Sequence, residues 1–127
     1  MKPINSHEAP NAIGPYSQAI RTGNLLYCSG QTPLDTVSMK IKTDDIESQT
    51  LQVINNLKTV LSEAGLTLSD VVKTNVFLSD MGNFKRMNVV YAECFGTHKP
   101  ARSTVAVKGL PYNALIEIEC IAEINTN

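Results

Sequence analysis

Residues 44–65, DDIESQTLQVINNLKTVLSEAG, contain the strongest helix signal in the sequence, and the segments around them are interpreted from it. Asp44 can cap the first turn, and Glu47 stands three residues later, which is the spacing of a capping box. Gly65 is placed to end the helix in a left-handed conformation. The apolar residues recur at helical spacing, at Ile46, Val53, Ile54, Leu57, Val60, Leu61 and Ala64. The opposite face is expected to be solvated, and it carries Gln49, Gln52, Asn56, Lys58 and Glu63.

Short strands are expected on both sides of this helix. Thr22-Gly23-Asn24 favours a hairpin turn between the first two strands, and residues 1–15 are expected to form an extended arm. Asp80 can cap a second helix, which Gly96 stops. The patterns predict strands over 16–21, 25–29, 71–78, 103–107 and 115–124, and the second helix over 82–95. The order ββ-α-β-α-ββ predicts one α+β domain over residues 1–127, with both helices on one face of one sheet.

The other face of that sheet has no helix to cover it. One side of the last strand is apolar and carries Ile116, Ile118, Cys120, Ala122 and Ile124. The other side mixes apolar and acidic residues, namely Leu115, Glu117, Glu119, Ile121 and Glu123. A mixed face of this kind is compatible with a solvated surface and equally with a subunit interface.

Composition and charge exclude several classes of protein. The formal net charge is −1, from 11 basic and 12 acidic residues, and there is no Trp. Strong non-specific nucleic-acid binding depends on a basic surplus and is therefore not expected. The cysteines (Cys28, Cys94, Cys120) and histidines (His7, His98) are widely spaced, so neither a metal site nor a disulfide framework is expected.

The N-terminus is polar and proline-rich, and no apolar segment is long enough to span a bilayer. We therefore expect a soluble, cytoplasmic protein without a membrane partner.

A few positions break their local pattern and are candidates for function. Asn88 lies on a helix face that should be buried, where it needs a hydrogen-bond partner, either structural or in a ligand. Arg102 can grip a carboxylate at two points, but it can also be a surface arginine or a partner of Glu117 or Glu119. Those two glutamates share one strand face, which suits acid–base chemistry and a solvated strand alike. Ser29-Gly30 ends an apolar strand where a ligand can approach the backbone, and neither a nucleophile elbow nor a phosphate loop is present.

Four blocks of sequence, in the same order, resemble the Rid family, also known as the YjgF family, the reactive intermediate deaminases or the L-PSP endoribonucleases. They are IGPYSQA at 13–19, SGQTPLD at 29–35, PARS at 100–103, and Leu110-Pro111 followed by IEIE at 116–119. The resemblance covers nearly the whole chain. It implies a chorismate-mutase-like α+β fold with a mixed sheet, assembled as a homotrimer whose sheets form a central barrel. It also implies active sites in clefts between subunits and no metal or organic cofactor.

The resemblance also implies an activity and a site. Founding-type members hydrolyse 2-imino acids such as 2-iminobutanoate and 2-iminopropanoate, which pyridoxal-phosphate enzymes release, to 2-oxo acids and ammonia. By this likeness Arg102 binds the substrate carboxylate and Glu117 positions the attacking water. The residues that line the cleft in relatives correspond to Tyr16, Ser29, Gly30 and Asn88. Thr104 is also placed in the substrate site, where many bacterial members have a cysteine, and Lys99 stands where an apolar residue is common.

Three functions compete at this point. The first is a cofactor-independent hydrolase that acts on small 2-imino acids. The second is an endoribonuclease or translation inhibitor of the L-PSP type, which the near-neutral charge disfavours. The third is a non-catalytic module that binds small carboxylates, which would need the same arginine.

Overall fold

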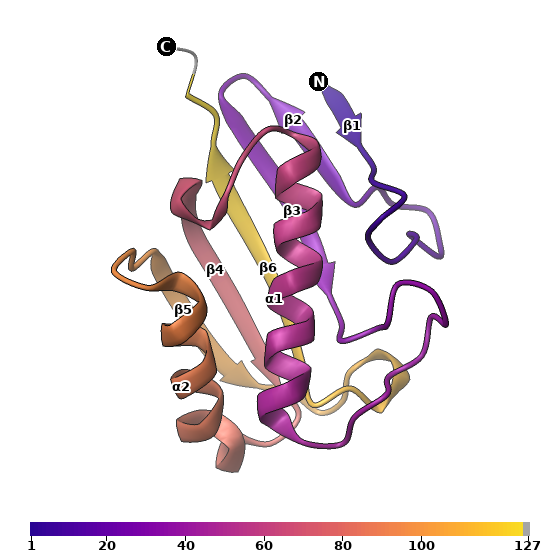
Figure 1. Cartoon of the computed structure of the whole chain (residues 1–127), viewed down its shortest axis with the longest axis vertical. Coiled ribbons are helices and arrows are strands. Elements are labelled where there is room, and N and C mark those ends of the chain that lie inside the picture. The colour runs from indigo at the N-terminus through magenta and orange to yellow at the C-terminus, as the bar shows by residue number, and fades with distance from the viewer. Residues whose placement is uncertain (126–127) are drawn as a thin grey trace.

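The computed structural model describes residues 1–125, which form a six-stranded sheet and two α-helices (Figure 1). The strands are β1 (Lys2–Ile4), β2 (Ala19–Thr22), β3 (Leu25–Gln31), β4 (Val71–Leu78), β5 (Ala101–Ala106) and β6 (Ile116–Glu123). The helices are α1 (Ile46–Glu63) and α2 (Phe84–Phe95), and the short 3-10 turns are η1 (Leu68–Asp70), η2 (Met81–Asn83) and η3 (Pro111–Asn113). The predicted element order is confirmed, with β1 as an addition in the N-terminal arm.

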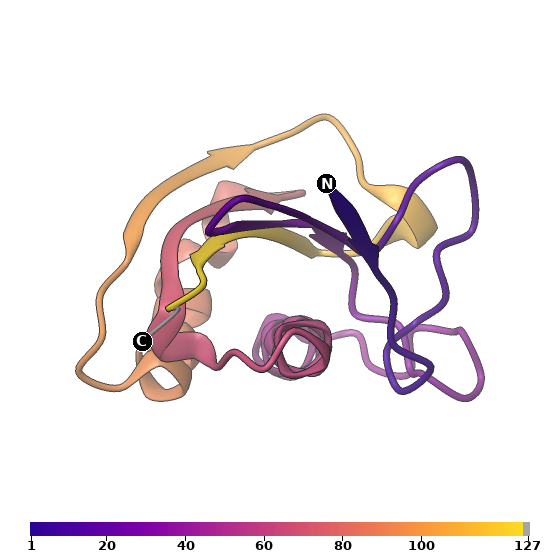
Figure 2. The same cartoon turned by 90° about the horizontal axis from the view of Figure 1, so that it is seen from above.

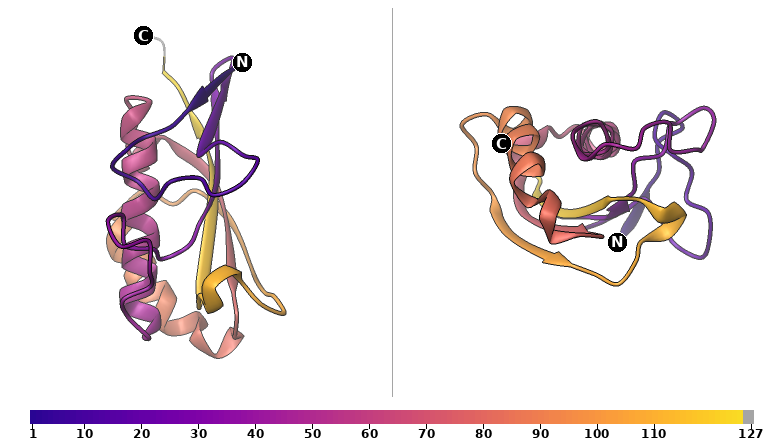
Figure 3. Two further views of the ribbon diagram at one scale, coloured as in Figure 1. Left: turned by 90° about the vertical axis from the view of Figure 1, so that its right-hand side faces the viewer. Right: turned by 90° about the horizontal axis from the view of Figure 1, so that it is seen from below.

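The sheet is mixed and has the strand order β1-β2-β3-β6-β4-β5. Strands β4 and β5 pair in parallel, and α2 forms the crossover between them, whereas the other neighbours pair antiparallel. Both helices lie on the same side of the sheet, which leaves the other side open (Figures 2 and 3). This arrangement confirms the prediction of two helices on one face.

Several element boundaries differ from the sequence prediction for local reasons. Asp45, rather than Asp44, caps α1, and its side chain accepts a hydrogen bond from the Ser48 amide at 2.8 Å. Gly65 follows the helix with a φ of 75°, as expected. The second helix begins at Phe84, because η2 occupies the preceding turn.

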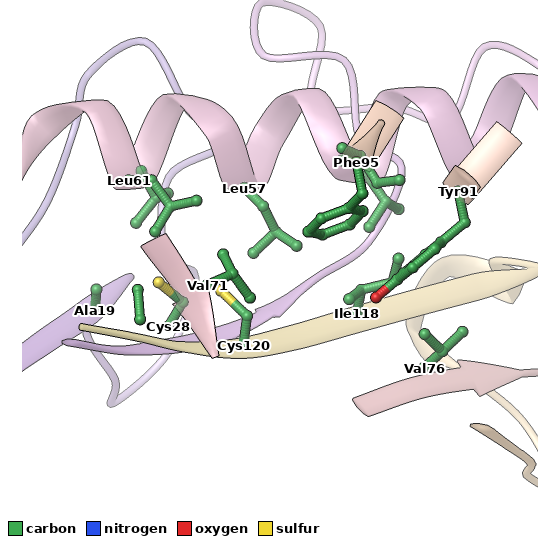
Figure 4. Close-up of a cluster of buried hydrophobic side chains, with 14 of the residues drawn as sticks. Ala19, Cys28, Leu57, Leu61, Val71, Val76, Tyr91, Phe95, Ile118 and Cys120 are labelled. Atoms are coloured by element: carbon green, nitrogen blue, oxygen red, sulfur yellow. The ribbon is translucent and has the colours of Figure 1, made fainter. Parts of the chain in front are cut away.

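The hydrophobic core lies between the sheet and the helices (Figure 4). Alternate residues of β6 point into it, and α1 covers them with its apolar face, as both patterns predict. Its fully buried members include Leu26, Ile54, Leu57, Leu61, Val76, Met87, Ile116 and Ile118. Burial of one such side chain contributes roughly 1.5–3 kcal/mol, so this core fixes the sheet against both helices.

Gln18 attaches the N-terminal arm to the sheet. Its amide is only 2% exposed, and its Oε1 accepts a hydrogen bond from the Ser6 amide at 2.6 Å. Its Nε2 donates to the Pro10 carbonyl at 2.8 Å and to the Ser6 carbonyl at 3.1 Å. The segment after Ser6 is therefore held beside the end of β3, where it forms one wall of the cleft described below.

The open face of the sheet carries large apolar side chains next to acidic ones. Tyr27 and Val105 are 45% and 46% exposed, and Phe77 and Ile121 are partly exposed. Glu117 lies on the same face, opposite Phe77 in the β4–β6 ladder. Exposed apolar groups gathered on one face are typical of a surface that another molecule covers.

Within residues 1–125, neither helix is long and apolar enough to cross a membrane.

The expectation that the polar face of α1 is fully solvated is wrong at Gln49 and Asn56, which are 3% and 1% exposed. Asn56 donates from Nδ2 to the carbonyls of Thr32 and Leu34, at 3.2 and 3.0 Å. Gln49 donates to the Thr43 carbonyl and accepts from the Leu115 amide, both at 2.8 Å. These amides are buried because the loops before α1 and β6 fold over the helix and take their hydrogen bonds from it.

Asn56→Ala should therefore lower the free energy of unfolding by about 1–3 kcal/mol, because it leaves the buried Leu34 carbonyl without a donor. Urea denaturation would measure the change. Asn55→Ala is the matched control, since Asn55 is exposed on the same helix and its substitution brings the same gain in helix propensity. Equal effects of the two substitutions would contradict the role assigned to the Asn56 amide.

Candidate functional site

Six of the residues predicted from the sequence form two groups on the structure, and the first lies in a cleft at the end of β3. Glu117, Gly30 and Tyr16 line this cleft, which we call the glutamate cleft. The N-terminal arm and the loop before β6 complete its walls with Pro10, Asn11, Ala12, Thr32, Pro111 and Tyr112. The β3–β6 pairing brings Gly30 and Glu117 together, although they are 87 positions apart in sequence, and the segment before β2 adds Tyr16.

Gly30 makes room for the Glu117 side chain. A Cβ atom on Gly30 would lie 2.9 Å from Cδ of Glu117, which is closer than real contacts allow. The register of β3 against β6 shifts between Cys28 and Gln31, which is the mark of a β-bulge at Ser29-Gly30. This shift and the missing side chain bring the carboxylate of Glu117 against the backbone of β3.

Ser29 itself has a structural role in the described structure. Its amide donates to the Gln18 carbonyl at 2.9 Å, and its hydroxyl donates to the Ser17 carbonyl at 2.7 Å. These bonds hold the bulge against the segment before β2. Ser29 lies next to the glutamate cleft and supports its backbone, rather than lining it.

Glu117 is an available carboxylate. Burial raises its pKa above the usual value of 4.5, and the negative charge of Glu119 raises it further. Glu119 accepts a hydrogen bond from Nδ2 of Asn75 at 3.1 Å, whereas no group among residues 1–125 donates to Glu117. A half-buried carboxylate with a raised pKa and no donor is suited to accept a proton from a bound water.

The second group, which we call the arginine cluster, contains Arg102, Asn88 and Thr104 between β5 and α2. Arg102 pairs with Thr74 in the parallel β4–β5 ladder, so its side chain lies on the helix side of the sheet. Its guanidinium carbon lies 4.8 Å from the centroid of the Tyr91 ring and 5.7 Å from that of Phe84. Within residues 1–125 it forms no ion pair, so the alternative of a structural bond to Glu117 or Glu119 is wrong.

Asn88 and Thr104 bring polar atoms without partners into the same layer. Thr104 stands two residues after Arg102 on β5 and therefore points to the same face. Asn88 lies on α2 between Phe84 and Tyr91, on the stripe that Arg102 crosses. Asn88 Oδ1 and Thr104 Oγ1 are buried without a hydrogen bond, a property that only Thr50 Oγ1 shares within the described residues. Buried orphan groups of this kind cost about 1–3 kcal/mol each unless a ligand or water satisfies them.

The glutamate cleft and the arginine cluster do not meet within one chain. Glu117 pairs with Phe77 of β4, and Arg102 pairs with Thr74. Positions 74 and 77 point to opposite faces of a strand, so Glu117 faces the open side of the sheet and Arg102 faces the helices.

Two aromatic residues of the site were missed by the sequence analysis. Tyr91 falls within the helix predicted over 82–95, and its contact with Arg102 is set only when β5 lies beside α2. Tyr112 lines the glutamate cleft with a φ of 61°, which is unusual for a tyrosine, and its sequence context Pro111-Tyr112-Asn113 carries no signal for a site. Within residues 1–125 there is no group of three or more His, Cys, Asp or Glu placed to hold a metal ion.

Comparisons with known proteins identify relatives of this chain by sequence. The family model described as endoribonuclease L-PSP matches residues 6–124. A RutC family protein of Pyrococcus horikoshii is 52% identical over 119 residues, which are 94% of each chain. The chloroplastic Reactive Intermediate Deaminase A of Arabidopsis thaliana is 45% identical over 121 residues, covering 95% of this chain and 65% of the plant protein.

Solved structures show the same fold. The YjgF gene product of E. coli aligns with a TM-score of 0.93 and 39% identity, over 98% of this chain and 100% of that one. E. coli TdcF with bound serine aligns with a TM-score of 0.93 and 36% identity, over the same shares of the two chains. The chain therefore belongs to the Rid family, whose other names are the YjgF family and the endoribonuclease L-PSP family.

Proposed function

We propose that this protein hydrolyses small 2-imino acids, such as 2-iminobutanoate and 2-iminopropanoate, to 2-oxo acids and ammonia. The observation that carries the proposal is a pair of charged side chains, the Arg102 guanidinium and the Glu117 carboxylate, that have no hydrogen-bond or ion-pair partner among residues 1–125. A 2-imino acid presents a carboxylate for the first group and an electrophilic carbon, open to water, for the second. One relative is named a reactive intermediate deaminase, and another binds serine, which also carries a carboxylate and a nitrogen on adjacent carbons.

The reaction needs little from the protein beyond orientation and one base. Arg102 holds the carboxylate at two points, and the orphan oxygens of Asn88 and Thr104 accept hydrogen bonds from donors on the substrate. Glu117 takes a proton from water as its oxygen bonds to the imine carbon, and the C=N π electrons move to nitrogen. Glu117 returns this proton to nitrogen, which gives a carbinolamine. Transfer of the hydroxyl proton to the same nitrogen, again through Glu117, forms the carbonyl group and breaks the C–N bond, releasing ammonia and the 2-oxo acid.

Because the two groups face opposite sides of one sheet, we infer that each site is shared by two copies of the chain. The inferred assembly is a homotrimer in which the open faces of three sheets pack into a barrel. Support comes from the apolar side chains Tyr27, Phe77, Val105 and Ile121, which surround the glutamates on that face. One copy contributes the glutamate cleft, and its neighbour contributes the arginine cluster.

An endoribonuclease activity is the alternative that the family description suggests. The near-neutral charge of the chain does not favour it, since RNA binding draws on basic surfaces. RNA cleavage measured beside imine loss, in a reaction that an amino-acid oxidase or threonine dehydratase supplies with imine, separates the two activities. Binding of 2-oxo acids without imine turnover would instead support a non-catalytic module.

The first prediction concerns the assembly. Sedimentation equilibrium at micromolar concentration should give three times the 13.8 kDa mass of one chain, because the exposed apolar face is buried in the trimer. A mass equal to that of a single chain would contradict the shared site.

The second prediction concerns Arg102. Arg102→Ala should lower kcat/KM for imine hydrolysis by about thirtyfold to several thousandfold, as expected when about 2–5 kcal/mol of charge pairing is lost. Arg102→Lys should restore only part of it, because an ammonium lacks the planar two-point grip. Arg86→Ala is the matched control, since Arg86 donates two hydrogen bonds to Glu47 away from the site. Near wild-type turnover in Arg102→Ala trimers would show that Arg102 is structural.

The third prediction concerns the pH dependence. Hydrolysis needs ionised Glu117, so kcat/KM should fall on acidification through a pKa above 4.5, the direction that burial and Glu119 impose. Glu119→Gln should keep the activity and move this fall to lower pH, because the neighbouring charge is gone. Glu117→Gln should lower kcat/KM by about 10²–10⁴ and abolish the fall. A Glu117→Gln variant with an unchanged profile would exclude this residue as the base.

A further inference from the structure

Arg102 is a long cationic side chain that has no acidic partner among residues 1–125 to fix its direction. A free arginine side chain populates many rotamers, and binding a ligand would have to overcome this entropy. A protein carboxylate would fix the guanidinium, but it would also neutralise it and compete with the substrate. The described residues provide no such carboxylate, so another device must direct this side chain.

The aromatic stripe of α2 is that device in the structure. Tyr91 and Phe84 are seven residues apart, which places them two turns apart on one helix face. The guanidinium carbon of Arg102 lies within cation–π distance of both rings, nearer to Tyr91. The face of an aromatic ring attracts a cation without occupying its hydrogen-bond donors. The N–H groups of the guanidinium therefore remain free to bind a carboxylate.

The Tyr91 ring is itself fixed. Its hydroxyl lies 2.7 Å from Thr74 Oγ1 of β4, in a buried contact, and the Phe95 ring stacks on it with centroids 4.5 Å apart. Figure 4 shows Tyr91 and Phe95 pointing from α2 toward the sheet, with the Tyr91 hydroxyl at the strand side. Thr74 is also the residue that pairs with Arg102 in the β4–β5 ladder, so ring and guanidinium share one anchor on the sheet.

We propose that Tyr91 is a positioning residue, whose ring holds the Arg102 guanidinium in one place while leaving its hydrogen-bond donors free for the substrate carboxylate. The meaning of this role for catalysis rests on the function proposed above. Burial raises the pKa of Tyr91, so its ring stays neutral and leaves the positive charge of Arg102 uncancelled. The Tyr91 hydroxyl fixes the ring by its contact with Thr74 and takes no part in the reaction.

The test follows the Arg102 guanidinium by NMR in the intact protein, with Arg102→Lys used to assign its Nε–Hε signal. In the wild type this signal should be shifted by the ring current of Tyr91. Tyr91→Phe keeps the ring and should retain the shift, whereas Tyr91→Leu should lose it. Tyr91→Met, which fills the gap with a flexible chain, serves if Tyr91→Leu fails to fold. Leu61→Ala is the control for lost packing, because it removes a buried side chain from α1 but leaves Tyr91, Phe84 and the Phe95 ring that stacks on Tyr91.

Binding of 2-oxobutanoate and imine kinetics supply the second readout. Tyr91→Leu should weaken binding and raise KM about tenfold at nearly unchanged kcat, and Tyr91→Phe should stay within about twofold of wild type. An Arg102 signal identical in Tyr91→Leu and wild type would overturn the positioning role whatever the activity. Unchanged binding in Arg102→Ala would instead refute the proposed function, while the NMR shift would still decide the role of Tyr91.

Discussion

The alternation of side chains along β4 is the constraint on which the rest of the structure depends. Thr74 of β4 pairs with Arg102, and Phe77 pairs with Glu117, so the two candidate site residues are fixed on opposite faces of the sheet. The hydrophobic core holds this register, because a slip of one residue would expose Ile116 and Ile118 and bury the glutamates. A single chain therefore cannot bring Arg102 and Glu117 together, and this separation is the reason for proposing a site shared between copies of the chain.

The glutamate cleft and the arginine cluster both contain polar groups that would have hydrogen-bond partners in a protein selected for stability alone. In the part of the chain that the structure describes, Glu117 is half-buried without a donor, and Arg102 packs against aromatic rings instead of a carboxylate. Asn88 and Thr104 each bury an oxygen that has no hydrogen bond from those same residues. Unsatisfied groups of this kind lower stability, and their concentration around one layer is typical of a site preorganised for a polar ligand. The core between the sheet and α1 supplies the stability that this arrangement requires.

The sequence was sufficient for the helices, the strands and their order, because those signals are local. Helical spacing located α1, and period-two alternation separated Glu117 from the core face of β6. The burial of Asn56 could not be predicted, since it depends on the course of the loop that folds over α1. The bulge at Ser29-Gly30 and the stacking of Arg102 on Tyr91 arise only when strands distant in sequence are paired. The family resemblance assigned Arg102 and Glu117 to one active site, but only the strand register places them on opposite faces of the sheet.

The shared site is the central claim, and mixing two defective variants tests it most directly. Arg102→Ala and Glu117→Gln chains, each inactive alone, would be unfolded together, refolded in equal amounts and checked by mass for mixed trimers. Random assembly places an intact arginine cluster beside an intact glutamate cleft in about a quarter of the sites, so imine hydrolysis should return to about a quarter of the wild-type rate. Mixed trimers that stay as inactive as their parents would contradict the account.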